Sequence, residues 1–151
     1  MSMINPGQEI EEVLEAAVVL AQTYGHEYVT LEHLAYAIVN HEPFFKLIND
    51  YGVDATDVLE EFDEYLSQQT ALVSKSEQKD ELPRRTQALE RAINRSLTHV
   101  LFTGRDSLQI IDVFLSIQME QQSHASYFLI KHGLNKVAFV EYYNKHYAVL
   151  S

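Results

Sequence analysis

An internal repeat is the feature of this sequence that most constrains its fold. A shift of 79 residues places Gly25 on Gly104, and a shift of 81 places Gly52 on Gly133. The difference of two residues indicates a small insertion near the stretch EQQSHA in the second copy. Each copy holds roughly 60 residues, a length at which an independent hydrophobic core is marginal. The two copies are therefore expected to share one core.

Within each copy, hydrophobic residues recur at the three- and four-residue spacing of an amphipathic helix. Residues 8–24 show this spacing, and Gly25 follows them where a left-handed C-cap belongs. Thr30 is expected to be the N-cap of the next helix, because its hydroxyl can accept a backbone N–H. In the second copy, Gly104 is expected to end the corresponding first helix. These patterns predict an all-α fold of eight helices, arranged as two pseudo-twofold four-helix repeats.

The two repeats are expected to span residues 8–69 and 86–147, within one domain that covers residues 1–151. Between them, residues 70–85 lose the helical spacing, are mostly polar and contain Pro83. Such a composition is typical of a connection that runs over the surface. We therefore expect a linker there.

The charge of the chain narrows its range of partners. It carries 22 acidic and 11 basic residues, a net charge of −11, so the phosphates of nucleic acids would be repelled. No apolar run is long enough to span a bilayer. Cysteine is absent, which excludes disulfides and cysteine-ligated zinc and is consistent with a reducing cytoplasm. We therefore expect a cytoplasmic, monomeric domain that contacts neither nucleic acid nor membrane.

Four side chains that can bind metals or transfer protons lie within eight residues, namely His26, Glu27, Glu32 and His33. Zinc motifs on a helix place two histidines four residues apart, whereas His26 and His33 are seven apart and separated by a helix start. No nucleophile motif or phosphate-binding loop is present. The residues therefore favour neither catalysis nor a metal site, and His26 and His33 are the candidate ligands if a metal binds.

Structural roles account for much of this cluster. Besides the capping role of Thr30, His33 is expected to pack or hydrogen-bond at the entrance of the second helix. Glu32 lies in the first turn, where the helix dipole favours a carboxylate whatever its function. Glu27 differs, because it lies in the joint between two helices, where an exposed charge is a usual recognition element.

Three stretches of the sequence resemble a known family. GHEYVTLEHLAYAIV resembles the His-Glu-x-x-Thr-x-Glu-His-Leu signature in the N-terminal domain of Clp-type AAA+ unfoldases, with ClpA-type members the most similar. In the second copy, ERAINRSLTHVLFTGRD and SHASYFLIKHGL resemble the corresponding helices of that domain. The resemblance covers about residues 8–147 and implies that domain's doubled four-helix fold.

The resemblance also implies a function. The domain would be a non-catalytic docking module without a cofactor, while ATP and the ClpP peptidase would bind elsewhere on the parent unfoldase. It would bind a ClpS-type adaptor that delivers N-degron substrates for unfolding and degradation. The adaptor-binding residues carried over are Glu27 and Glu32, together with Thr86 and Gln87 at the start of the fifth helix. Gln87 stands where the family is expected to have arginine.

Two other functions stay open at this point. One is a small metal-dependent hydrolase built on the four residues His26, Glu27, Glu32 and His33. The other is a recognition domain for unfolded or modified proteins, such as those carrying phosphoarginine, with Glu32 and Asp112 as candidate acidic residues. The chain also has more aromatic residues than one small core needs, namely Phe44, Phe45, Tyr127, Phe128, Phe139, Tyr142, Tyr143 and Tyr147. Most of them are still expected to belong to the core, and a few near the end of the chain could leave an apolar groove between the repeats.

Overall fold

The computed structural model describes residues 5–73 and 81–146. These residues contain eight α-helices: α1 (Gln8–Thr23), α2 (Leu31–Asn40), α3 (Glu42–Tyr51), α4 (Ala55–Ser67), α5 (Gln87–Phe102), α6 (Ile110–Gln118), α7 (His124–Lys131) and α8 (Val137–His146). They also contain a short 3₁₀ helix, η1 (Thr70–Leu72), and four two-residue strands, β1 (Asn5–Pro6), β2 (Tyr28–Val29), β3 (Arg84–Arg85) and β4 (Ser107–Leu108). The predicted all-α fold of two four-helix repeats is confirmed. None of the described helices is long and apolar enough to cross a membrane.

The helix ends follow from local chemistry. Gly25 and Gly104 have φ angles of 70° and 76°, a left-handed conformation that a residue with a Cβ rarely adopts, and they end the turns after α1 and α5. Asp54 is the N-cap of α4, and its side chain accepts a hydrogen bond from the backbone N–H of Thr56 at 2.9 Å. Ser123 caps α7 in the same way, by accepting the backbone N–H of Ser126. The chain therefore turns at defined residues between helices.

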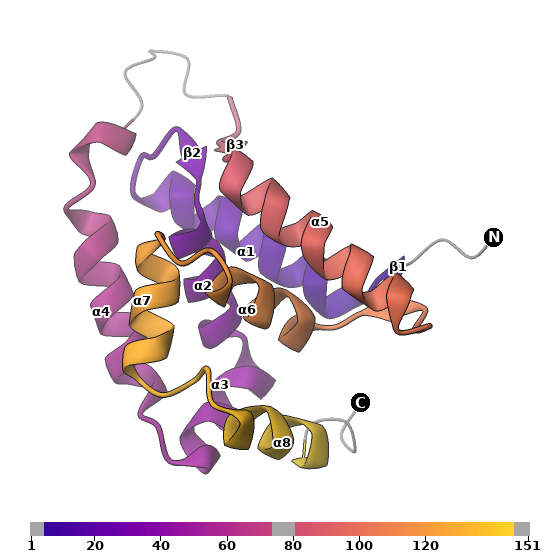
Figure 1. Ribbon diagram of the computed structural model, residues 1–151. Helices are drawn as coiled ribbons and strands as arrows, with labels where there is room; N and C mark the ends of the chain where they lie inside the picture. The colour runs from indigo at the N-terminus through magenta and orange to yellow at the C-terminus, as the bar shows by residue number, and fades with distance from the viewer. Residues whose placement is uncertain (1–4, 74–80, 147–151) are drawn as a thin grey trace.

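The four strands form two parallel pairs that the sequence pattern did not predict. β1 pairs with β4, placing Asn5 opposite Ser107, and β2 pairs with β3, placing Tyr28 opposite Arg84. The same shift of 79 residues places β1 on β3 and β2 on β4, so it converts one pair into the other. Each pair therefore joins one repeat to the other, as the pseudo-twofold arrangement requires (Figure 1).

Helices α2 and α6 are the most buried elements and contact each other (Figure 1). Leu34 and Ile38 on α2 and their equivalents Val113 and Ile117 on α6 are fully buried. Hydrophobic residues of both repeats belong to one continuous cluster. Because neither four-helix repeat encloses these residues alone, burial of apolar surface holds the two repeats together.

The expected linker contains a short element at each of its ends. Residues 70–72 form η1, and a single antiparallel bridge pairs Val73 with His26. At the other end, residues 84–85 form β3. Both segments pair with the stretch between α1 and α2, which residue composition alone does not reveal. The middle of the expected linker, residues 74–80, lies outside the described residues.

Most of the aromatic residues singled out in the sequence belong to the core, as expected. Phe44 packs against Phe114 and Phe139, with ring centroids 5.0 and 6.0 Å apart. Phe128 and Tyr143 are also buried, Phe45 and Tyr142 are half-buried, and Tyr127 is exposed. Tyr147 lies outside the described residues. The aromatic side chains therefore stabilise contacts between α3, α6 and α8.

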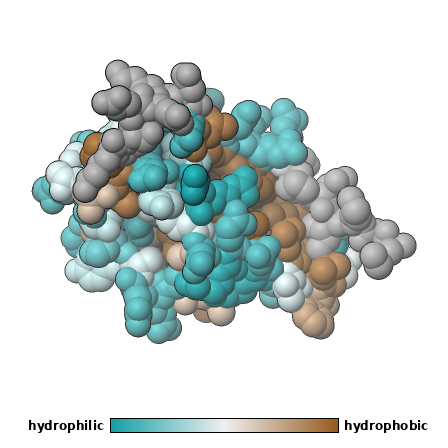
Figure 2. All heavy atoms as spheres, turned by 90° about the horizontal axis from the view of Figure 1, so that it is seen from above, coloured by the Kyte–Doolittle hydropathy of each residue, from teal (hydrophilic) through white to brown (hydrophobic). Residues whose placement is uncertain are grey.

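Hydrophobic residues nevertheless reach the surface. The face seen from above carries a band of them, flanked by hydrophilic residues (Figure 2). The described chain exposes several large hydrophobic side chains, among them Val19, Leu82, Phe102 and Val137. Single residues of this kind are common on soluble proteins, whereas contiguous ones can indicate a binding surface.

Candidate functional site

Glu27 lies on a short edge where three separate segments meet. Its backbone N–H donates to the carbonyl of Leu72 at 2.7 Å, and its own carbonyl accepts from the N–H of Arg84 at 2.9 Å. The backbone on either side is thus held by η1 and β3, while the Glu27 side chain is exposed. The exposed carboxylate is therefore carried by a backbone segment whose position on the surface is fixed.

Thr86 and Gln87 lie at the same edge. The Thr86 N–H donates to the carbonyl of Val29 at 3.1 Å, which continues the β2–β3 pairing by one residue. The half-buried Thr86 is the N-cap of α5, because its hydroxyl accepts a hydrogen bond from the N–H of Leu89 at 3.2 Å. Gln87 follows as the first residue of α5 and is exposed. Glu27 therefore lies at the start of the β2–β3 pair and Thr86 and Gln87 at its end, and we call these three residues the β2–β3 edge.

Glu32 is placed differently from the other three predicted residues. Only 9% of it is exposed, and its Oε2 accepts a hydrogen bond from the backbone N–H of Ala125 at 2.9 Å. Ala125 lies in the first turn of α7, where free N–H groups and the helix dipole favour a carboxylate. The carboxylate thus links the first repeat to the second. Its role in adaptor binding stays a prediction.

An arginine-lined cleft adjoins the β2–β3 edge. Its volume is about 540 Å³, and Gln87 lies in its wall beside Arg85, Arg91 and Arg95. Acidic residues face these arginines, since Arg85 lies 3.5 Å from Glu90, and Arg91 and Arg95 each lie 2.5 Å from Glu120. The placement of Arg85 opposite Val29 was not predicted, because it depends on the pairing of β2 with β3.

The two histidines of the opening cluster contact each other. Thr30 N–H donates to Nδ1 of His33 at 2.9 Å, so Nδ1 of a neutral His33 must lack a proton. The proton is therefore on Nε2, which lies 2.9 Å from Nδ1 of His26 and donates to it. The Thr30 hydroxyl accepts from the His33 N–H at 3.4 Å, which completes a capping box at the start of α2.

Burial keeps this pair neutral. Removal from water, and to a smaller extent the neighbouring His26, together lower the pKa of His33 to about 4. Burial also lowers the pKa of His26. The ring of Tyr24 stacks on His26 with centroids 5.2 Å apart, and its hydroxyl donates a hydrogen bond to Asp63. The pair is thus enclosed between the end of α1, α2 and a side chain from α4.

The four residues proposed for a metal-dependent hydrolase do not form one ligand set. Glu32 bonds to α7, Glu27 is exposed at the β2–β3 edge, and the two histidines bond to each other. Within residues 5–73 and 81–146, no three side chains of histidine, aspartate or glutamate are grouped so that they could hold a metal ion.

The second repeat carries an ion pair where the first carries the histidines. A shift of 79 places His26 on Arg105 and His33 on Asp112. The two guanidinium nitrogens of Arg105 lie 2.5 and 3.2 Å from the two Asp112 oxygens, a bidentate pair. Asp112 also accepts from the N–H of Gln109, the N-cap of α6, at 2.8 Å. Asp112 therefore has internal partners, as does Glu32, the other acidic residue considered for phosphoarginine.

Comparison with protein families identifies the architecture. Residues 5–132 match the model described as the Clp repeat (R) N-terminal domain. The chain belongs to this family. The Clp N-terminal domain is 28% identical over 134 residues to a ClpA homolog protein from Fuscovulum blasticum. That match covers 88% of this chain and 17% of the relative, so this Clp N-terminal domain corresponds to a small part of the relative's length.

Solved structures show the same fold. The N-terminal domain of Hsp104 from Candida albicans superposes with a TM-score of 0.68 at 11% identity, covering 88% of this chain and 83% of that one. The N-terminal domain of the ClpV1 ATPase from E. coli gives a TM-score of 0.63 at 15% identity, covering 86% and 85%. A chain from a malarial protein secretion system gives 0.75 at 13% identity, covering 93% of both. At these identities the likeness concerns the fold of Clp N-terminal domains.

Proposed function

We propose that this Clp N-terminal domain is the docking module of an ATP-dependent Clp unfoldase subunit in the cytoplasm. It binds a ClpS-type adaptor and thereby recruits N-degron substrates for unfolding and degradation. The observation that supports the proposal is that Glu27 and Thr86–Gln87 flank the same β2–β3 pair, at its start and at its end. These residues come from different repeats, and the family resemblance assigns all three to adaptor binding.

The geometry of the edge suits recognition. The Glu27 and Thr86 backbones are held by hydrogen bonds of 2.7 to 3.1 Å, so little conformational freedom is lost when a partner binds. The exposed Glu27 carboxylate and Gln87 amide offer acceptors and a donor next to the arginine-lined cleft. Charges of both signs at such an edge favour one orientation of a partner.

The proposed mechanism is recruitment without chemistry in this domain. The histidines are neutral and hydrogen-bonded to each other, and Glu32 is bonded to α7. A docking module tethered to an unfoldase ring raises the local concentration of cargo at the ring. ATP would be bound by the rest of the unfoldase, and the ClpP peptidase would be reached only through it.

Calorimetric titration with a purified ClpS-type adaptor tests the proposal. We expect one-to-one binding by the wild-type domain and a loss of at least about tenfold in affinity for Glu27→Lys. Glu141→Lys is the matched control, because it reverses an exposed charge on α8 without touching the edge. Absence of wild-type binding, or equal weakening by both variants, would contradict the proposal. Circular dichroism of each variant verifies that the helices are intact.

A further inference from the structure

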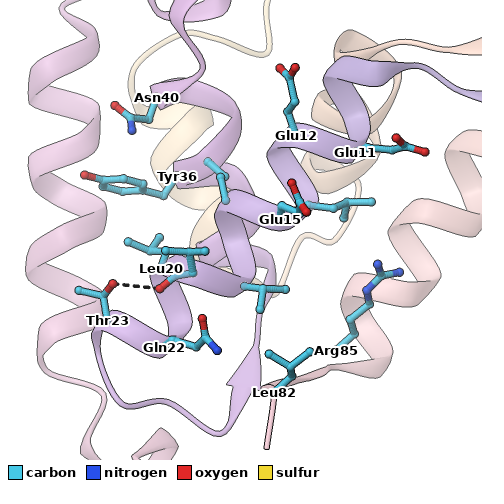
Figure 3. A pocket seen from close by; sticks show the side chains of 15 residues that line it. Glu11, Glu12, Glu15, Leu20, Gln22, Thr23, Tyr36, Asn40, Leu82 and Arg85 are labelled. Carbon is cyan, nitrogen blue, oxygen red and sulfur yellow. Dashed lines mark hydrogen bonds between the residues drawn. The ribbon is translucent and has the colours of Figure 1, made fainter. Parts of the chain in front are cut away.

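A second surface, separate from the exposed side chains of the β2–β3 edge, lies along the outer face of α1. A groove of about 1060 Å³ follows α1 and is bounded by α2 on one side and by Leu82 and Arg85 on the other (Figure 3). Its apolar lining includes Leu14, Val18, Val19, Leu20, Tyr36 and Leu82. Val19 is 58% exposed and Leu82 is 68% exposed. Apolar side chains gathered in one groove are a feature of binding surfaces.

The lining also carries a net negative charge. Glu11, Glu12 and Glu15 project from the N-terminal half of α1, beside the apolar residues of its C-terminal half (Figure 3). Arg85 is the only cation among the described residues of the lining, and it lies 3.5 Å from Glu90. Neither Glu11 nor Glu15 forms an ion pair with another described residue. Their charges are therefore available to a partner.

We propose that the α1 groove binds a basic amphipathic segment of a partner polypeptide. Helix α1 has 16 residues and is about 24 Å long, room for three to four turns of a partner helix. The apolar stripe of that helix would cover Val19, Leu20 and Leu82, in the manner of helix-in-groove recognition. Its lysine or arginine residues would face Glu11 and Glu15.

Charge complementarity selects this partner over others. A segment with acidic residues would meet the carboxylates of α1 and the net charge of −11. Anionic lipid surfaces and nucleic acids would be repelled for the same reason. An uncharged apolar segment could cover Val19 and Leu82 but would leave Glu11 and Glu15 beside an interface without partners. A basic amphipathic segment would cover the apolar half of the groove and would pair its charges with the carboxylates of the acidic half.

A defined probe tests this proposal. An 18-residue peptide of leucine and lysine, ordered to give one apolar stripe per helix, is titrated into the full chain at several salt concentrations. A peptide of identical composition in scrambled order measures attraction by net charge alone. We expect the striped peptide to bind at one site, at least about tenfold more tightly than the scrambled one. Its affinity should fall as salt rises, because ion pairs contribute.

Variants locate the site. Val19→Glu should weaken the striped peptide at least about tenfold, and the double change Glu11→Lys with Glu15→Lys should weaken it and flatten the salt dependence. Matched controls are Val137→Glu, at a valine of α8 that is even more exposed than Val19, and Glu141→Lys. Both controls should leave the affinity unchanged. Equal binding of striped and scrambled peptides, or a Val19→Glu affinity equal to wild type, would overturn the proposal.

The experiments distinguish failure of the α1 groove proposal from failure of the adaptor proposal, on which the groove does not depend. Val19→Glu should leave binding of the ClpS-type adaptor intact, and Glu27→Lys should leave binding of the striped peptide intact. If the adaptor fails to bind while the striped peptide binds and responds to Val19→Glu, the groove proposal stands and the adaptor proposal does not. Loss of both ligands in the Val19→Glu variant, with its helices intact, would overturn the assignment of the groove to a separate partner.

Discussion

The Nε2 of His33 lies 2.9 Å from the Nδ1 of His26, so two buried imidazoles form one hydrogen bond at the entrance of α2. The arrangement requires both rings to be neutral. A proton added to His33 would go to Nδ1, which already accepts the N–H of Thr30. A proton added to Nδ1 of His26 would face the Nε2–H of His33. Protonation of either histidine therefore favours the unfolded chain over the folded one.

The stability of the domain should fall in mild acid. The pKa of His33 is about 4 in the folded chain and near 6.5 when unfolded, so between these values the unfolded chain binds the extra proton. The free energy of unfolding should decline as pH falls from about 6.5 to about 4, by at most about 3 kcal/mol from this residue. Below about pH 4 this contribution is fully lost. Denaturant unfolding at a series of pH values measures it.

A double variant tests whether the histidine pair causes this decline in stability at low pH. His26→Arg with His33→Asp places in the first repeat the pair that the second repeat has at Arg105 and Asp112. We expect the variant to fold and to lose much of the decline between pH 6.5 and 4, relative to wild type. A decline of unchanged size would show that other groups cause it.

Glu32 should contribute to stability. Its carboxylate accepts the N–H of Ala125 in the first turn of α7, and Glu32→Gln removes the charge that the helix terminus favours. We expect a loss of about 1 kcal/mol in the free energy of unfolding for Glu32→Gln, and about 2 kcal/mol for Glu32→Ala, which leaves the N–H without its partner. Chemical denaturation measures both. Unchanged stability would mean that the carboxylate does not hold the repeats together.

Two neighbouring residues at the β2–β3 edge should respond differently to alanine. Thr86→Ala removes the side-chain acceptor for the N–H of Leu89 and should cost about 1 kcal/mol of stability. Gln87→Ala changes an exposed side chain and should leave stability within about 0.5 kcal/mol of wild type. Thermal unfolding of the two variants side by side makes the comparison. Equal loss in both would contradict the N-cap assignment.

The shared core predicts cooperative unfolding. Leu34 on α2 and Val113 on α6 are equivalent, fully buried positions in the two repeats. Leu34→Ala should cost about 3–5 kcal/mol and Val113→Ala about 2–3 kcal/mol, and both variants should keep a single transition. Calorimetry and circular dichroism should give coincident curves. A second transition in either variant would show that the repeats unfold separately.

The helices and their caps could be predicted because they depend on neighbouring residues. The spacing of hydrophobic side chains specifies the buried face of α2, and the Thr30 hydroxyl is three residues from the N–H that it accepts. The strands could not be predicted, because two residues show no alternation and their pairing joins segments more than 50 residues apart. For the same reason, the sequence could not reveal that β3 returns to the segment beside Glu27.

Within the candidate site, the burial of Glu32 likewise depends on a contact with a distant segment and could not be predicted from the sequence. Its place in the first turn of α2 was evident from the sequence, and so was the favourable helix dipole. However, the carboxylate also bonds to the N-terminus of a second helix, α7. The position of α7 depends on the packing of the second repeat, which the sequence pattern does not show. Glu27, Thr86 and Gln87 could be proposed from resemblance, whereas their placement along one strand pair required the fold.

Mapping the adaptor contact by nuclear magnetic resonance tests the central claim most directly. The labelled domain is titrated with an unlabelled ClpS-type adaptor, and backbone amide shifts are followed residue by residue. The proposed docking site predicts that the largest changes fall at Glu27, Tyr28 and residues 84–87, with α8 unaffected. Saturating changes confined to α7 and α8, or no changes at all, would contradict docking at the β2–β3 edge.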